Sequence, residues 1–393
     1  MKRLLRYSSL LFLLLLVEST LSLWCQARPF SSFTQPPIQR LLDYPLILPM
    51  HLHSVPIHIV HLGDSHLQSG YLGDALRKTL SKSYSLAGYG LVSPYSLAGS
   101  NAPESYRYQS QENWSSCTLS YIKSCTPTPP CGILLQQNRL QSISFTFSCT
   151  RYPFDQLLLF RGEDSPSLSS VGVACSLKEG RKSYSGMVVD TLTFLTPQRS
   201  VSLRSTATPQ GRVSYGGALL LLRGSRSNDL VKKDLLYSQI GINGAMYANF
   251  AREEFIEALT ALNPCYLLFS LGANESLAPR FSTTEFKRQV LSLINKTQKA
   301  LPQTQLILST PAPNFKGRVF NKSSLRAAQV IREVAAEQNI LLIDLYEFIG
   351  GEQGAEEKRK SGNYYNRDGV HFSIEGYHHQ GIFFARELEK LLP

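Results

Sequence analysis

A serine, an aspartate and a histidine in this sequence have the types and the settings that nucleophilic catalysis needs. Ser65 lies in HIVHLGDSHLQSG, after an apolar-alternating run and at the first turn of a predicted helix. Unpaired backbone N–H groups and the positive end of the helix dipole favour a developing negative charge there. Asp368 and His371 stand three residues apart in NRDGVHFSIEGY, on a predicted loop before the last helix. Such a serine requires a base that accepts its proton and a carboxylate that orients this base.

Two further motifs offer groups that can hold a negatively charged oxygen. The stretch SQIGINGAM places Gly244 in a glycine-rich turn before a predicted helix, where a bare backbone N–H can approach a substrate. The stretch LLFSLGANES ends a predicted buried strand with Gly272 and Asn274, which places a side-chain amide at the carboxyl edge of a sheet. In open α/β sheets, ligands bind at that edge.

Each motif also has an ordinary structural interpretation. Serine and asparagine are preferred helix N-caps, so Ser65 and Asn274 fit that role without any chemistry. Gly244 fits a plain turn, and the Asp-Gly pair that begins at Asp368 is a common turn dipeptide. A loop histidine such as His371 is usually just exposed. The motifs therefore indicate catalysis only when they are taken together.

The elements that must position these residues alternate between strand and helix. A first strand is predicted over 57–62, and an amphipathic helix over 71–80. From about Val231 onward, short apolar runs alternate with helical patterns, which predicts a parallel sheet with helices on both faces. The strands are expected at 265–271, 305–309 and 340–345, and the helices at 246–262, 284–301, 323–339 and 375–392.

The middle of the chain has a different pattern. Helical periodicity is absent from about 105 to 225, and clusters of Gly, Ser and Pro separate short strand-like segments. We therefore predict an all-β, sandwich-like domain at 105–230, inserted into a discontinuous α/β domain formed by 56–104 and 231–393. The strands of the insert are expected at 142–149, 157–160, 171–177 and 218–222.

In chain order, the motifs GDSH, the glycine of GINGA, GAN and DGVH resemble the four blocks of the SGNH hydrolase superfamily, also called GDSL esterases. The resemblance covers residues 56–82 and about 231–393. It implies a three-layer α/β/α, flavodoxin-like fold. It also implies a serine esterase that needs no metal and no organic cofactor.

The resemblance assigns a role to each residue that matches a block. Ser65 corresponds to the nucleophile, His371 to the base and Asp368 to the partner of that base. Gly244 and Asn274 correspond to oxyanion-hole donors, together with the backbone N–H of Ser65. The catalytic interpretation of Ser65 thereby becomes preferable to a capping role.

The sequence departs from the common pattern of the superfamily at two places. His66 replaces the usual leucine after the serine, and the predicted β domain separates the first block from the second. Both features are similar to a subgroup that includes bacterial peptidoglycan O-acetylesterases, some of which carry a carbohydrate-binding-module-like β-sandwich there. We interpret His66 as a structural side chain, with substrate contact as the alternative.

The resemblance predicts removal of O-acetyl or other short acyl groups from a cell-wall or other polysaccharide, with acetylated peptidoglycan as the expected substrate. A lipase, an arylesterase or an acyltransferase would use the same site residues. A protein of another class, a glycan-binding or adhesion protein with a vestigial site, would have lost the serine, the histidine or the asparagine. The sequence retains all three.

The N-terminus has the pattern of an export signal. Basic residues precede a short apolar core, and a small residue ends the segment, so residues 1–27 are predicted to be a signal peptide. The proline-rich stretch 28–55 then reads as an extended lead-in. We expect a protein of the bacterial periplasm or cell envelope, without a membrane span after cleavage. Lipid attachment at Cys25 is the less favoured alternative, because Trp24 is not a small residue.

The cysteines fit an oxidising compartment. Removal of residues 1–27 leaves an even number, which indicates disulfides whose pairing the sequence does not fix. Five of the six lie in the predicted insert, so complete pairing requires a bond to Cys265. No cysteine or histidine spacing is typical of zinc. The six are Cys117, Cys125, Cys131, Cys149, Cys175 and Cys265.

The charge balance indicates anionic surroundings. The formal net charge is +11, of which residues 1–27 supply +2, so that +9 remains on the mature chain. A basic surface suits acidic glycans, cell-wall polymers or membranes, although scattered lysines and arginines also serve solubility. A nucleic-acid partner is not expected, because no basic-aromatic recognition motif is present. Oligomeric state is left open.

Overall fold

The computed structural model describes residues 56–121, 125–138, 142–223 and 232–392. These residues all belong to one compact unit. The predicted signal peptide at 1–27, the predicted lead-in at 28–55 and Cys25 lie outside the described residues. No described helix has the length and apolar character needed to cross a membrane.

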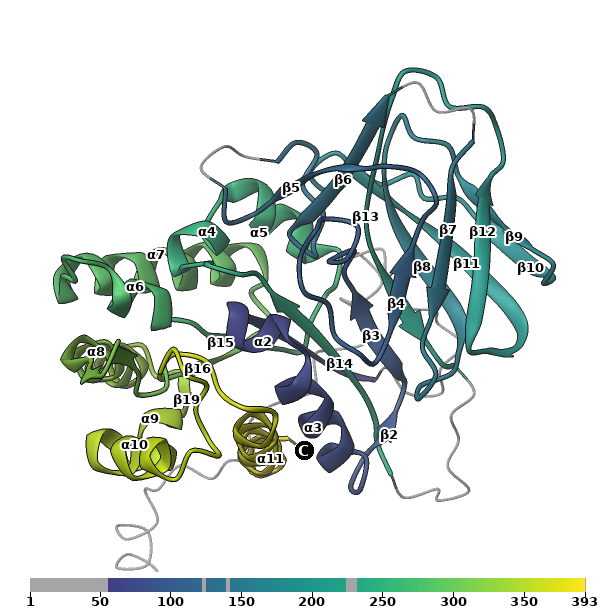
Figure 1. Ribbon diagram of the computed structural model, residues 1–393. Helices are drawn as coiled ribbons and strands as arrows, with labels where there is room; N and C mark the ends of the chain where they lie inside the picture. Colours follow the sequence, from purple (N-terminus) through teal and green to yellow (C-terminus); the bar gives the residue numbers. More distant parts are fainter. Residues whose placement is uncertain (1–55, 122–124, 139–141, 224–231, 393) are drawn as a thin grey trace, which may run out of the picture. The chain divides into compact units, whose positions relative to one another are not determined.

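A parallel sheet of six strands forms the α/β part (Figure 1), which confirms the predicted fold class. Parallel strands require crossover connections, and the helical patterns between the apolar runs provide them. In sheet order, the strands are β19 (Leu341–Ile343), β16 (Gln305–Ser309), β15 (Tyr266–Ser270), β1 (Ile57–Gly63), β14 (Asp234–Gly241) and β2 (Ser85–Leu86).

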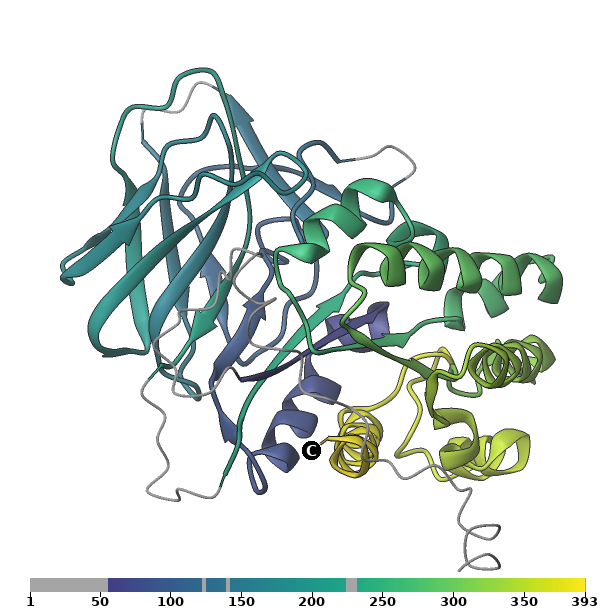
Figure 2. The same cartoon turned by 180° about the vertical axis from the view of Figure 1, so that it is seen from behind.

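Helices cover both faces of this sheet (Figures 1 and 2). On one face, α3 and α11 pack against each other, and side chains such as Ile59, Leu268 and Ile307 complete their core. Successive strand residues point to opposite faces, so Val60 and Leu267 face the other helices. The helices are α2 (Ser65–Gln68), α3 (Tyr71–Leu80), α4 (Tyr247–Phe250), α5 (Glu253–Thr260), α6 (Ala273–Leu277), α7 (Thr283–Ala300), α8 (Lys322–Glu337), α9 (Leu345–Ile349), α10 (Gly351–Lys360) and α11 (Ile374–Leu391).

The single helix predicted over 246–262 is wrong. Two helices, α4 and α5, occupy that stretch, and Arg252 between them has an extended backbone with φ −72° and ψ 138°. The other predicted helices of the C-terminal part are present, with ends displaced by one or two residues.

Two antiparallel sheets form the β-rich part of the chain. The larger contains β10 (Cys175–Lys178), β11 (Met187–Gln198), β8 (Phe154–Gly162), β13 (Arg212–Leu221), β6 (Ile133–Asn138) and β5 (Ser115–Thr118) in that order, with β3 (Gly88–Val92) also paired to β13. The smaller has the order β4 (Arg107–Gln109), β7 (Ser144–Ser148), β12 (Ser200–Ser205) and β9 (Leu168–Val171). A separate hairpin joins β17 (Phe315–Lys316) and β18 (Val319–Phe320).

The strand predicted over 171–177 is wrong. The strand β9 ends at Val171 and β10 begins at Cys175, because Gly172 adopts a left-handed φ of +79° between them. The other predicted strands of the middle region correspond to β7, β8 and β13.

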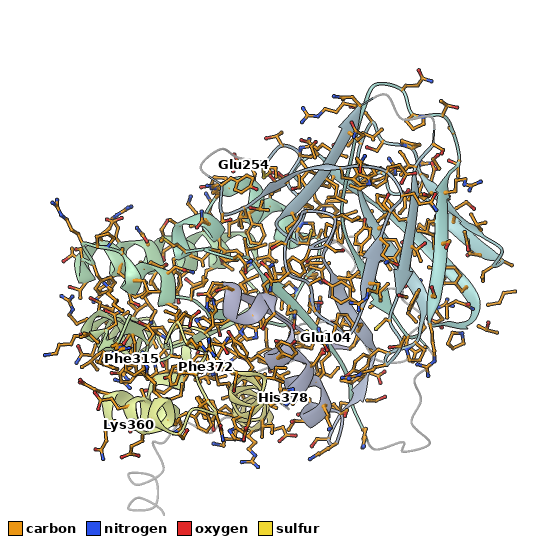
Figure 3. The ribbon with its side chains drawn as sticks, in the orientation of Figure 1. Glu104, Glu254, Phe315, Lys360, Phe372 and His378 are labelled. Atoms are coloured by element: carbon orange, nitrogen blue, oxygen red, sulfur yellow. A yellow bond between two sulfur atoms is a disulfide. The ribbon has the colours of Figure 1, made fainter. Side chains whose placement is uncertain are left out.

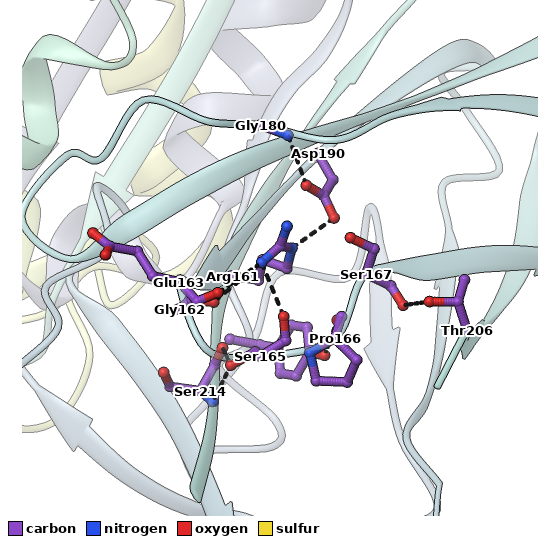
Figure 4. A network of polar contacts seen from close by, with 11 residues as sticks. Arg161, Gly162, Glu163, Ser165, Pro166, Ser167, Gly180, Asp190, Thr206 and Ser214 are labelled. Atoms are coloured by element: carbon purple, nitrogen blue, oxygen red, sulfur yellow. Dashed lines mark hydrogen bonds and ion pairs between the residues drawn. The ribbon is translucent and has the colours of Figure 1, made fainter. Parts of the chain in front are cut away.

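A buried ion pair fixes two neighbouring strands of the larger antiparallel sheet (Figure 4). The Nε of Arg161 on β8 lies 2.7 Å from an oxygen of Asp190 on β11, and both side chains are almost fully buried. A second guanidinium nitrogen of Arg161 donates to the carbonyl of Ser165 at 2.9 Å. The other oxygen of Asp190 accepts the backbone N–H of Gly180 at 3.0 Å. The buried charges are thus both paired and hydrogen bonded, as burial requires.

The predicted disulfides are represented by a single bond, and the complete pairing that would require a bond to Cys265 does not occur. Cys117 and Cys125 form a disulfide, whereas Cys131, Cys149, Cys175 and Cys265 carry free thiols. Cys131 and Cys149 are buried. Burial raises the pKa of the Cys131 thiol to about 12, so it packs as a small apolar side chain. Cys265 lies at the start of β15, where its backbone N–H donates to the carbonyl of His58 in the parallel sheet.

Candidate active site

Three neighbouring strands of the parallel sheet deliver three of the predicted site residues to one edge. In the register, Gly63 at the end of β1 is paired with both Gly241 of β14 and Ser270 of β15. The chain leaves these strands at their carboxyl ends. Ser65 follows β1, Gly244 lies in the segment directly after β14, and Asn274 lies in the segment directly after β15. The sheet topology therefore explains why motifs far apart in the sequence meet.

The structure brings Ser65, His371 and Asp368 into one hydrogen-bonded chain. Ser65 Oγ lies 2.9 Å from His371 Nε2, and His371 Nδ1 lies 2.7 Å from an oxygen of Asp368. The other carboxylate oxygen of Asp368 accepts the backbone N–H groups of Val370 and His371, at 2.8 and 2.9 Å. The carboxylate is thus fixed by its own loop, and it fixes the imidazole in turn.

The environment of Asp368 favours its charged form. Partial burial on its own would raise the pKa of this carboxyl group. The hydrogen bonds from the His371 side chain and from two backbone N–H groups outweigh that effect and hold the pKa below its usual range. Asp368 is therefore ionised at neutral pH and can stabilise a positive charge on His371.

The residues predicted to hold an oxyanion lie beside Ser65. Gly244 adopts a left-handed φ of +72°, and its backbone N–H donates no hydrogen bond within the described part of the chain. Ser65 opens α2, so its N–H has no acceptor within that helix. The Nδ2 of Asn274 donates to the carbonyl of Ala245 at 3.0 Å and to Asp64 at 3.3 Å. The Asn274 amide is thereby held between the first and second motifs.

Asp64 is a site residue whose role the sequence did not reveal. Its side chain is almost fully buried, and its two oxygens accept from different motifs. One accepts the backbone N–H of His66 at 3.0 Å, which caps the short helix α2, and the other accepts from Asn274. The signal was present in the GDSH motif, but aspartate before a helix is also an ordinary cap.

His66 packs against His371, the predicted base. Its Nδ1 lies 3.1 Å from the hydroxyl of Tyr377 on α11, and its ring lies 5.2 Å from the ring of His371 and 5.6 Å from that of Phe372. Burial lowers the pKa of His66, so it is neutral beside His371. These contacts fit the interpretation of His66 as a structural side chain.

Gln68 connects α2, the helix that begins at Ser65, to the Gly244 segment, and no sequence motif indicated this role. Its side chain is buried, and its Oε1 accepts the backbone N–H of Asn243 at 2.8 Å. Its Nε2 donates to Ser100 Oγ at 2.7 Å and to the carbonyl of Asn101 at 2.9 Å. The side chain of Asn243 also donates to Asn101 Oδ1, at 2.8 Å. The loop around residue 100 therefore holds the residue next to Gly244 through Gln68.

Replacement of Gln68 by methionine is expected to lower kcat for a small ester about tenfold, because the N–H of Asn243 loses its acceptor and the neighbouring Gly244 is less well positioned. Steady-state kinetics measure this effect. KM should change little, since the side chain does not face the reacting atoms. A loss confined to thermal stability, with normal kcat, would contradict the positioning role.

Glu275, next to Asn274, is a buried acid that anchors the start of α4. Its Oε1 accepts the backbone N–H of Tyr247 at 2.7 Å, and its Oε2 has no partner among the described residues. Burial raises the pKa of Glu275 to about 7, against the lowering effect of the Tyr247 N–H, and the negative charge of Asp64 adds to the rise. The carboxyl group is thus close to half protonated at neutral pH.

This raised pKa predicts a pH-dependent stability. The unfolded chain releases the proton of Glu275 near its ordinary pKa of 4.5, whereas the folded chain keeps it until about pH 7. Stability from this group is therefore complete below about pH 4.5 and is lost as the pH rises through 7. The free energy of unfolding should fall by on the order of 3 kcal/mol over that range.

Glu275→Gln should remove this pH dependence, because glutamine keeps the acceptor for Tyr247 without an ionisable group. Denaturant unfolding from pH 4.5 to 8.5 measures the difference between the two proteins. We expect the variant to be the more stable of the two at pH 8.5. A parallel pair of curves would contradict the assignment.

Comparison with known proteins supports the same class. Residues 208–379 match the GDSL-like Lipase/Acylhydrolase family, a stretch that holds Gly244, Asn274, Asp368 and His371 but not Ser65. No match was found among curated protein sequences.

Three solved structures are among those similar to this chain. A peptidoglycan O-acetylesterase superimposes with a TM-score of 0.69 at 21% identity, over 86% of this chain and 91% of that chain. A lipase/acylhydrolase from Enterococcus faecalis gives 0.34 at 21% identity, over 41% and 79%. An acetyl xylan esterase gives 0.33 at 20% identity, over 41% and 82%.

The family match over residues 208–379 and the likeness in fold support the class that the four sequence blocks predicted, an SGNH hydrolase. The matched family is that of GDSL-like lipases and acylhydrolases, which supports an esterase.

Proposed function

We propose that this esterase removes O-acetyl groups from peptidoglycan outside the cytoplasm, with Ser65, His371 and Asp368 as its catalytic residues. The observation that carries the proposal is the chain of hydrogen bonds from Ser65 Oγ through His371 to Asp368, at 2.9 and 2.7 Å. The substrate is inferred from the peptidoglycan O-acetylesterase that superimposes over most of both chains. The predicted signal peptide and the disulfide support the location.

In the proposed reaction, His371 Nε2 accepts the Ser65 proton as Oγ forms a bond to the ester carbonyl carbon. The carbonyl oxygen becomes an oxyanion, which the N–H groups of Ser65 and Gly244 and the amide of Asn274 stabilise. The longer Asn274 bond, 3.3 Å to Asp64, is the one that the oxyanion replaces. His371 then protonates the sugar oxygen as its bond to the carbonyl carbon breaks, so that the sugar leaves as a free hydroxyl and the acetyl group stays on Ser65.

Water completes the cycle. His371 accepts a proton from water as the water oxygen attacks the acetyl carbon. The bond between that carbon and Ser65 Oγ then breaks, Oγ takes the proton from His371, and acetate is released. Asp368 holds the Nδ1–H of His371 throughout and stabilises the imidazolium.

We also propose that residues 105–230 form a domain of their own, inserted between the discontinuous parts 56–104 and 231–393 of the hydrolase domain. The strand β3, at Gly88–Val92, already pairs with β13 in the larger antiparallel sheet, so this pairing crosses the proposed boundary at 104.

The test is acetate release from O-acetylated peptidoglycan by the purified protein, beside Ser65→Ala and with acetylated xylan as a competing substrate. Release from peptidoglycan that disappears in the variant supports both the substrate and the serine mechanism. Ser65-dependent hydrolysis of an aryl acetate, without release from either polymer, would refute the proposed substrate. Transfer of the acetyl group to an added sugar would identify an acyltransferase instead.

A further inference from the structure

The β17–β18 hairpin lies against the loop that carries Asp368 and His371. The backbone N–H of Phe315 donates to the carbonyl of Gly369 at 3.0 Å. A guanidinium nitrogen of Arg359 on α10 donates to the carbonyl of Gly317 at 2.8 Å. The hairpin is therefore fixed to the catalytic loop by its backbone.

The other side of the hairpin is fixed to α6, the helix that carries Asn274. The side chain of Asn321 donates to the carbonyl of Ser276 at 3.0 Å and to the side-chain oxygen of Asn314 at 2.8 Å. Lys316 Nζ lies 3.3 Å from the carbonyl of Ala278, at the end of α6. The hairpin thus connects the helix of the proposed oxyanion donor with the loop of the proposed base.

Aromatic side chains pack against the hairpin. The ring of Phe315 lies 5.6 Å from that of Tyr365, which lies 4.6 Å from that of Phe372; Phe315 and Phe372 are labelled in Figure 3. The guanidinium group of Arg359 lies over the ring of Phe315, 4.3 Å from its centroid. The four hairpin residues that follow Phe315, 316–319, are all exposed.

Unpaired positive charges gather on and around this hairpin. Five lysine and arginine side chains belong to the hairpin or to the segments next to it. None of them forms an ion pair within the described part of the chain. No aspartate or glutamate occurs at 276–284 or 310–332, so the segments on both sides of Lys316 carry no compensating charge. The five, named here the basic rim, are Arg280, Lys316, Arg318, Arg359 and Arg367.

We propose that the basic rim binds carboxylates of the polymer beside the ester that is cleaved. This proposal rests on the proposed function, since the peptides of peptidoglycan supply such carboxylates. Guanidinium groups form paired hydrogen bonds with a carboxylate, and a cluster of positive charges near a site raises the local concentration of an anionic substrate. The rim therefore selects esters on acidic polymers over neutral esters of the same size.

The test measures inhibition at the active site rather than turnover of the polymer. Soluble peptidoglycan fragments without O-acetyl groups compete against a neutral aryl acetate, once with free carboxyl groups and once after amidation. For the full chain with Lys316→Gln and Arg318→Gln, we expect the inhibition constant of the carboxylated fragments to rise about tenfold. For the unchanged protein, amidation of the fragments should raise the inhibition constant by the same factor as the double substitution does. With amidated fragments, the two proteins should no longer differ.

The matched control carries Lys82→Gln and Arg386→Gln, which remove two exposed cations near the C-terminal ends of α3 and α11 that form no ion pair among the described residues. Its inhibition constant should stay within about twofold of the unchanged protein. An equal rise in both double variants, no inhibition of the unchanged protein by carboxylated fragments, or a variant effect that persists after amidation would overturn the proposal. Failure to release acetate from peptidoglycan would refute the proposed function alone, because the inhibition assay does not depend on it.

Discussion

Ser65→Ala is expected to lower kcat for an aryl acetate by about four orders of magnitude or more, because no other group can form the acyl-enzyme bond. His371→Ala should have a similar effect, since Ser65 Oγ then loses the base 2.9 Å away. The double variant should be no slower than either single variant, because the two residues act as one unit. Steady-state kinetics of the three variants measure the effect.

Ser69→Ala is the matched control for this prediction. It removes the same atom four residues later, where the hydroxyl only donates to the carbonyl of His66 at 3.3 Å. Its kcat should remain within about twofold of the unchanged protein. Residual Ser65→Ala activity of a few per cent, or losses that add in the double variant, would show that Ser65 is not the nucleophile.

Asn274→Ala is expected to lower kcat about a hundredfold or more, with little change in KM, because the amide stabilises charge that exists only in the transition state. The same change leaves one oxygen of the buried Asp64 without its Asn274 partner, so the protein should also lose about 1–3 kcal/mol of stability. Kinetics well below the melting temperature separate the two effects.

The comparison variant is Asn295→Ala, on the exposed side of α7, which should leave both quantities unchanged. Asn274→Asp would be informative as well, since a carboxylate beside Asp64 repels an oxyanion and should not restore activity. A normal kcat in Asn274→Ala would mean that the amide only joins the two motifs structurally.

The parallel sheet and the meeting of the motifs could be predicted because GDSH and GAN end apolar runs of strand length and DGVH directly precedes a helical pattern. The strand β14 was harder to recognise, since Ser238 and Gln239 interrupt its apolar pattern. Both are buried and partnered: Ser238 Oγ lies 2.9 Å from His58 Nε2, and Gln239 Nε2 donates to the carbonyl of Leu67 at 3.3 Å. Partners so distant in the sequence leave no local pattern.

The residues that hold the site were beyond prediction for the same reason. Gln68 is an unremarkable polar residue in a short helix until Asn243, 175 positions later, is placed against it. Glu275 follows Asn274 as an ordinary acidic residue, and only the fold buries it against the start of α4. Chemistry that depends on spacing was visible, and positioning that depends on packing was not.

The strands that enter and leave the β-rich part lie side by side. The backbone N–H of Leu222 donates to the carbonyl of Ala87 at 3.0 Å, and Leu221 is paired with Gly88. The antiparallel sheet therefore holds the two ends of the β-rich part together at Gly88 and Leu221. The parallel sheet does not itself have to close the long loop between them. The cost of closing a long loop grows only slowly with its length, so this junction can accommodate inserts of very different size. During evolution, an insert could be gained, exchanged or lost at this point while the order of the strands in the parallel sheet stayed the same.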